Sequence, residues 1–241
     1  MRSIALAMTI LLAAATSASA APLDITDIVG GWLNAVPPAN ATIVNAANQG
    51  TDTVRWPVPP DPNQSGYNFT PGADIIGAAL NTPLLLGTFQ HINQAIFSSI
   101  TAVDYAFGFS TNGVPNALSD TFHFDHNETP NAPGPPASDD IVTVSSVSLN
   151  ELITVGVDQF FFNLLGFSTD GGVTFSSQFS SPEGGTNTAQ LYGRVTSQPV
   201  GVPEPASLLL FGCGLAVAVA ARRKMSSRMR QSASEICELS S

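Results

Sequence analysis

The stretches of sequence that decide the fold are short, largely apolar and bounded by turn-forming residues. The two clearest are Leu84-Leu85-Leu86-Gly87-Thr88-Phe89-Gln90-His91-Ile92 and Thr121-Phe122-His123-Phe124-Asp125-His126. In the second stretch phenylalanine alternates with polar residues, which is the two-residue period of a strand with one buried face. Both stretches therefore predict β-strands.

Similar stretches recur throughout residues 51–198, each rich in β-branched or aromatic residues and separated by Gly, Pro, Asn and Asp. No amphipathic helical stretch lies between them, which favours an all-β, antiparallel β-sandwich of jelly-roll or immunoglobulin-like type over βαβ units. The predicted strands are residues 53–56, 67–70, 84–92, 100–109, 121–126, 140–147, 152–157, 159–167, 173–179 and 189–196.

Residues 21–50 have a different pattern. Ile25, Ile28, Trp32 and Leu33 recur at roughly helical spacing before two prolines interrupt the run. The pattern predicts a partly helical N-terminal segment that precedes the β-sandwich domain.

The first twenty residues have the features of a secretory signal peptide. Arg2 supplies a positive charge, residues 4–15 are almost entirely apolar, and Ala18-Ser19-Ala20 is a small-x-small site. We expect cleavage between Ala20 and Ala21, and therefore the Sec translocon and signal peptidase as partners.

The C-terminal end combines three blocks in a fixed order. They are Val202-Pro203-Glu204-Pro205, an apolar run at 206–221 that predicts a transmembrane helix, and the basic cluster Arg222-Arg223-Lys224. The basic cluster should hold its end in the cytoplasm, together with a tail at 225–241. Residues 199–224 resemble the PEP-CTERM sorting signal of bacterial proteins. The resemblance implies a membrane-held intermediate, processing by an exosortase, and delivery to the cell surface or to the exopolysaccharide matrix of a biofilm.

Charge and cysteine content limit what the exported part can be. Between residues 21 and 199 the sequence has fifteen acidic residues, but its only basic ones are Arg55 and Arg194. Such an acidic domain repels nucleic acid, so we expect no nucleic-acid partner. Both cysteines, Cys213 and Cys237, lie beyond residue 199, so the domain must be stable without a disulfide.

Several motifs of the ectodomain resemble the choice-of-anchor K group and the related THxN proteins. They are Arg55-Trp56 before a Pro-rich loop and residues 64–69, 87–96, 122–131, 139–142 and 183–193, with Gln90 where the usual Thr-His-x-Asn motif has threonine. The resemblance implies an exported β-domain without an established catalytic activity. It also identifies a set of family-motif residues, which we expect to be structural: Thr88, His91, Asn93, His126 and Glu128.

The histidines are the natural candidates for chemistry. Strand alternation places His91 on one face with Phe89 and Asn93, and it places His126 on the face of Phe122 and Phe124. One interpretation is a small site of His91, Asn93, His126 and Glu128 that binds a metal or polarises a substrate. The other, which we favour from the sequence, is that His91 and Asn93 hydrogen-bond to the backbone at a strand end.

Two further ligand hypotheses follow from residue type. Carboxylates are the ligands that calcium prefers, so calcium is the one cofactor considered. Because their spacing matches no calcium-loop motif, we favour the alternative that they are solvated surface carboxylates and that the domain has no cofactor. Trp56 and Tyr67 could form an exposed platform for stacking against sugar rings; the alternative, which we favour, is that Trp56 is a core tryptophan at the edge of the sandwich. The carboxylates considered for calcium are Asp120, Asp125, Glu128, Asp139 and Asp140.

No catalytic motif is present, and no cysteine is available for thiol chemistry in the domain. We therefore expect a non-enzymatic surface protein with a structural or adhesive role, with weak binding of glycan or calcium. The alternative is a secreted hydrolase that acts on polysaccharide, with Glu128 and Glu151 as a conceivable carboxylate pair.

Overall fold

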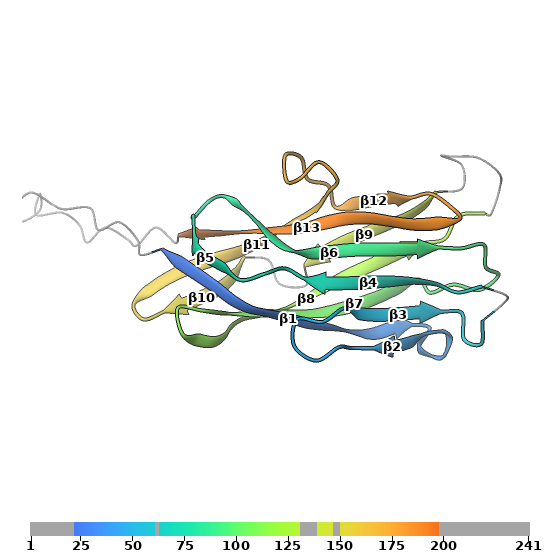
Figure 1. Cartoon of the computed structure of the whole chain (residues 1–241), viewed down its shortest axis with the longest axis horizontal. Coiled ribbons are helices and arrows are strands. Elements are labelled where there is room, and N and C mark those ends of the chain that lie inside the picture. Colours follow the sequence, from blue (N-terminus) through green and yellow to red (C-terminus); the bar gives the residue numbers. More distant parts are fainter. Residues whose placement is uncertain (1–21, 61–62, 131–138, 147–149, 198–241) are drawn as a thin grey trace, which may run out of the picture. The chain divides into compact units, whose positions relative to one another are not determined.

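The computed structural model describes residues 22–60, 63–130, 139–146 and 150–197, and in them it contains two antiparallel β-sheets (Figure 1). The first sheet has the order β12 (Gln178–Ser181), β9 (Asp140–Ser146), β8 (Val114–Asn127), β7 (Ala102–Thr111), β1 (Leu23–Val36) and β5 (Ile75–Ala78). The second has the order β10 (Glu151–Val155), β11 (Asp158–Ser168), β13 (Gly185–Ser197), β6 (Pro83–Asn93), β4 (Ser65–Pro71), β3 (Asp52–Trp56) and β2 (Thr42–Val44). The prediction of an all-β, antiparallel fold is confirmed.

Aromatic side chains from the two sheets meet in a shared core. Phe89 of β6 stacks on Phe124 of β8 with ring centroids 5.5 Å apart, and Trp32 of β1 lies 5.7 Å from Tyr67 of β4. All four side chains are buried. As the sequence predicts, side chains alternate along β6 and β8, and one face of each strand is buried against the opposite sheet.

The predicted N-terminal helix is wrong. Residues 23–36 form strand β1, and a single 3-10 turn, η1 (Pro38–Asn40), is the nearest helical element. The apolar spacing looks helical because the strand is bulged: its pairing with β7 shifts between Thr26 and Val29, and again between Leu33 and Val36. Each bulge adds a residue, so buried positions are separated by three residues at those points instead of two.

The segment at 21–50, which we expected to precede the sandwich, thus supplies strands to both sheets. β1 pairs with β7 and β5 in the first sheet, and β2 pairs with β3 at the edge of the second.

The predicted strand at 173–179 begins later than expected. β12 starts at Gln178, and the residues before it form a loop. The carboxylate of Asp170 accepts hydrogen bonds from the hydroxyls of Ser168 and Thr174, at 2.7 and 2.6 Å, and Gly171 and Gly172 have φ of 74° and 87°. This side-chain bonding competes with extension of the strand.

In the described part of the chain, no helix is long and apolar enough to cross a membrane. The predicted transmembrane helix at 206–221 lies outside the described residues.

We predict that Phe89→Ala lowers the free energy of unfolding by about 3–5 kcal/mol, because it opens a cavity where the two sheets meet. Phe97→Ala is the matched control. Phe97 is 85% exposed, so its replacement should lower the free energy of unfolding by no more than about 0.5 kcal/mol. Urea denaturation of both variants measures the difference, and equal losses would contradict the assignment of Phe89 to the core.

Candidate functional site

One end of the core is polar. Strand β8 ends shortly after His126, β9 begins at Asp140, and the two strands pair antiparallel with His126 opposite Val142. His91 lies near the end of β6 in the opposite sheet. The fold therefore brings together side chains that are 35 and 14 positions apart along the chain.

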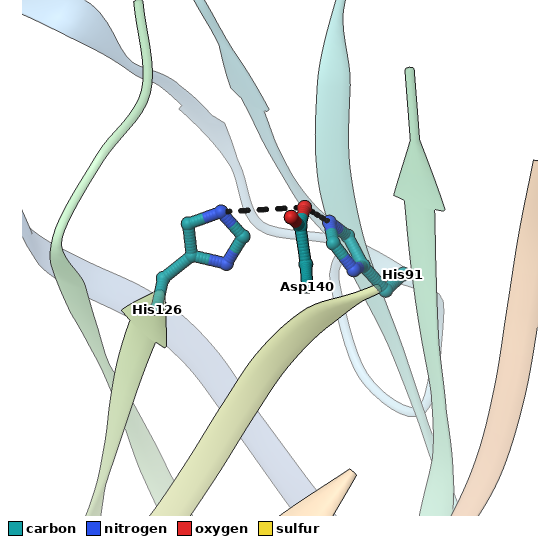
Figure 2. A group of neighbouring side chains, drawn as sticks. All are labelled: His91, His126 and Asp140. Atoms are coloured by element: carbon teal, nitrogen blue, oxygen red, sulfur yellow. Dashed lines mark ion pairs between the residues drawn. The ribbon is translucent and has the colours of Figure 1, made fainter. Parts of the chain in front are cut away.

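The imidazoles of His91 and His126 point toward the carboxylate of Asp140, which lies between them (Figure 2). Oδ2 of Asp140 is 4.0 Å from Nε2 of His91 and 3.9 Å from Nε2 of His126. All three side chains are fully buried. We call these three residues, together with Glu128, the histidine–carboxylate cluster.

Two more carboxylates approach the same point. Oε2 of Glu128 lies 3.2 Å from Nε2 of His126. Glu183, in the turn between β12 and β13, offers an oxygen that lies within 4.8 Å of those of Glu128 and Asp140. Three carboxylates and two imidazoles therefore gather at this end of the core.

His126 has a hydrogen-bond partner at each ring nitrogen. Its Nδ1 is 2.6 Å from the hydroxyl of Tyr67, and its Nε2 faces Glu128. The tautomer decides which nitrogen donates: a proton on Nε2 donates to Glu128 while Nδ1 accepts from Tyr67, and a proton on Nδ1 donates to the tyrosine oxygen.

Aromatic rings enclose the two histidines. Trp56 stacks on His91 with a centroid distance of 6.0 Å and an interplanar angle of 25°, and it meets His126 edge-on at 5.1 Å. Tyr67 packs edge-on against both imidazoles. These rings help to separate the two imidazoles from bulk water, which strengthens the electrostatic interactions that the imidazoles make.

Burial shifts the ionisation of several of these groups. Desolvation, together with the nearby His126, holds the pKa of His91 well below its usual value, so this ring is neutral. Desolvation raises the pKa of Asp140 to about 6; Glu128 and Glu183 add to this rise, while the Thr129 amide and His126 oppose it. Desolvation and the nearby Glu128 also raise the pKa of Glu183.

The structure brings four of the predicted residues together: His91, His126, Glu128 and Asp140. As strand alternation predicts, His91 is buried on one face with Phe89 and Asn93.

The hydrogen bonds that we expected there form only in part. The side-chain amide of Asn93 donates to the carbonyl of Ser181 at 2.7 Å. Among the described residues, however, neither ring nitrogen of His91 has a hydrogen-bond partner. The prediction that His91 bonds to the backbone is therefore wrong.

The carboxylates considered for calcium do not form one site. Asp125 points outward and lies 3.3 Å from the third histidine, His123. Asp139 accepts a hydrogen bond from Ser180, and Asp120 accepts one from Ser146. Only Glu128 and Asp140 of that set meet in the cluster.

Other predicted roles fail because of burial. Trp56 and Tyr67 are fully buried, so neither offers a ring face to a sugar at the surface, and the predicted stacking platform is wrong for both. Thr88 is half-buried on the opposite face of β6 from His91, so it cannot contact the cluster.

Sequence reasoning missed Glu183 as a neighbour of the cluster and Tyr67 as the partner of His126. Glu183 reaches the cluster from a turn that connects the two sheets. A contact of this kind depends on the tertiary fold, so no local sequence pattern predicts it. Tyr67 had a detectable signal, because its alternation with Phe69 in β4 predicts that it faces inward with its hydroxyl in need of a partner.

Comparison with known proteins identifies the C-terminal end of the chain. Residues 201–224 match the PEP-CTERM protein-sorting motif. The chain carries a PEP-CTERM sorting signal. This signal implies export, processing by an exosortase at the membrane and an extracellular destination. No curated protein matches the chain.

The residues of that signal lie outside the described part of the structure, and so does the predicted cleavage site at Ala20 and Ala21. This holds for Val202, Pro203, Glu204 and Pro205, and for the basic cluster Arg222, Arg223 and Lys224.

We predict that Tyr67→Phe lowers the free energy of unfolding by about 1–3 kcal/mol, because it leaves the buried Nδ1 of His126 without its partner. The matched control is Tyr192→Phe, which removes a hydroxyl that donates to Gln190 in a partly solvated position. The Tyr192→Phe variant should lose less than about 1 kcal/mol of free energy of unfolding. Thermal or urea unfolding of both variants measures the two losses. A Tyr67→Phe variant as stable as the wild type would contradict a hydrogen bond between Tyr67 and His126.

Proposed function

We propose that this protein enters the Sec pathway through an N-terminal signal peptide, is cleaved after Ala20, and is held in the inner membrane by residues 206–221. An exosortase then processes it near Val202-Pro203-Glu204-Pro205 and passes the β-domain to the cell surface or the extracellular polysaccharide. The observation that carries this proposal is the match of residues 201–224 to the PEP-CTERM sorting motif.

The role that we propose for the exported domain is structural or adhesive. Two features support it: a compact all-β domain lies upstream of the sorting signal, and its motifs resemble those of the choice-of-anchor K and THxN proteins. Weak binding of glycan or calcium fits this role.

We also propose that the domain is not an enzyme. The two histidines and Asp140, which are the strongest candidates for chemistry, are fully buried and enclosed by Trp56 and Tyr67. A polymer in solution has no contact with these groups, whereas glycosidases place their carboxylates beside the scissile bond.

Replacing Glu204 with alanine tests the sorting step. We expect the Glu204→Ala variant to accumulate in the membrane fraction at its unprocessed mass, because the exosortase no longer recognises the motif. The matched control is Glu235→Ala, which removes a carboxylate outside the motif and should be released like the wild type. Fractionation followed by mass spectrometry reads both outcomes, and normal release of Glu204→Ala would refute the proposal.

Incubation of the exported protein with extracellular polysaccharide from the producing cells tests the adhesive role. We expect the protein to co-sediment with the polymer without generating new reducing ends, and to leave dextran, as a control polymer, unbound. Release of reducing ends would favour the alternative of a polysaccharide hydrolase.

A further inference from the structure

The histidine–carboxylate cluster has the composition and geometry of a metal site. We infer that His91, His126 and Asp140 bind one divalent transition-metal ion of the Zn²⁺ class, with Glu128 beside His126, and that this ion cross-links the two sheets. The inference concerns the β-domain alone and does not depend on how the chain is sorted.

Distances between the donor atoms support a shared ion. Zinc bonds to imidazole nitrogen and carboxylate oxygen are about 2.0–2.2 Å, so two ligands of one ion lie at most about 4.0–4.4 Å apart. Oδ2 of Asp140 is 4.0 Å from Nε2 of His91 and 3.9 Å from that of His126. Neighbouring ligands in a tetrahedral zinc site are about 3.3 Å apart, so binding would draw the carboxylate of Asp140 and the two imidazoles slightly closer together.

The polar atoms aimed at this point lack partners. Within the described residues, Nδ1 and Nε2 of His91 and Oδ2 of Asp140 are buried and have no hydrogen bond. Buried polar atoms in native proteins are almost always satisfied, so each unsatisfied atom calls for a bound ion or water. A metal ion satisfies Nε2 of His91 and Oδ2 of Asp140 at the same time.

Neighbouring groups hold two of the ligands in place. With a metal on Nε2, the Nδ1 proton of His126 donates to the hydroxyl oxygen of Tyr67, 2.6 Å away. The other oxygen of Asp140, Oδ1, accepts a hydrogen bond from the amide of Thr129 at 2.9 Å. Such outer partners orient metal ligands and fix the histidine tautomer.

The local charge also favours a cation. The carboxyl groups of Glu128, Asp140 and Glu183 lie close together beside the two imidazoles, and buried carboxylates without a cation are costly. The two imidazoles favour a transition metal over calcium, which takes oxygen ligands.

Placement of the ligands indicates a structural ion. His91 belongs to β6 of the second sheet, while His126 and Asp140 belong to β8 and β9 of the first. The ion would therefore join the sheets at one end of the core, in a domain that has no cysteine for a disulfide. Structural zinc sites contribute directly to folding free energy.

The experiment uses the protein as the cells make it, either the processed form from the extracellular fraction or the membrane-held form in detergent. The chain is stripped with EDTA and dialysed against Zn²⁺, and bound metal and melting temperature are then measured. We expect one Zn²⁺ per chain and a rise in melting temperature of about 5–10 °C at a free concentration 100-fold above Kd.

Ligand variants test the assignment. Asp140→Asn keeps the shape and the acceptor for Thr129, and His91→Phe keeps a ring that can stack on Trp56, so both should fold. Neither variant should bind zinc, and the melting temperature of neither should rise when zinc is added. Tyr67→Phe should weaken zinc binding by about 10–100-fold, since it removes an orienting partner. The matched control is His123→Gln, which removes an outward-facing histidine that also lies beside two carboxylates and should bind zinc like the wild type.

Substitution with Co²⁺ adds a readout that does not depend on stability, because a tetrahedral nitrogen–oxygen site should give visible absorption that Asp140→Asn abolishes. A wild-type chain that binds no transition metal would overturn the inference, as would unchanged zinc binding in both ligand variants. Stabilisation by Ca²⁺ alone that persists in His91→Phe would also overturn it, and would point to the oxygens of Glu128, Asp140 and Glu183.

Discussion

Contact between the inner faces of the two sheets is the constraint on which the rest of the structure depends. The exported domain has no cysteine, so the sheets are held by what their facing side chains bury. Those side chains are mostly aromatic: Phe89 stacks on Phe124, and Trp32 packs against Tyr67, in each case across the interface between the sheets. Rings of this size bury a large area each and impose preferred packing geometries, which fixes how the sheets lie against each other.

The same constraint explains why the polar cluster is the most informative part of the domain. His91 and Asp140 occupy positions where alternation would otherwise place apolar side chains, and burial there removes their access to water. Burial of His91, His126 and Asp140 at one point lowers stability unless another interaction compensates for it. The distances between these side chains and their unpaired polar atoms support a metal ion that joins the sheets as this compensating interaction.

Sequence reasoning predicted the parts of this structure that depend on local pattern. Alternation in β6 and β8 gave the strands and the inward direction of His91 and His126. It failed in β1, where two bulges made the burial pattern look helical, and in the loop around Asp170, where side-chain bonding competes with strand extension. It left Trp56 open between a surface platform and the core, because a tryptophan beside a Pro-rich loop fits both, and the burial of Trp56 against the facing sheet decides for the core. The cluster itself depends on pairings between distant segments, so the meeting of Asp140 and Glu183 with the histidines could not be read from spacing.

The strands at the sheet edges have a consequence for how copies of the exported domain meet one another. In the described residues, the edge strands β2, β5, β10 and β12 contain 3, 4, 5 and 4 residues, respectively. Each offers only a few free backbone groups to a neighbouring molecule, and the excess of acidic over basic residues adds mutual repulsion. Copies of the domain that meet at high concentration therefore have little edge backbone with which to join their sheets into one continuous sheet.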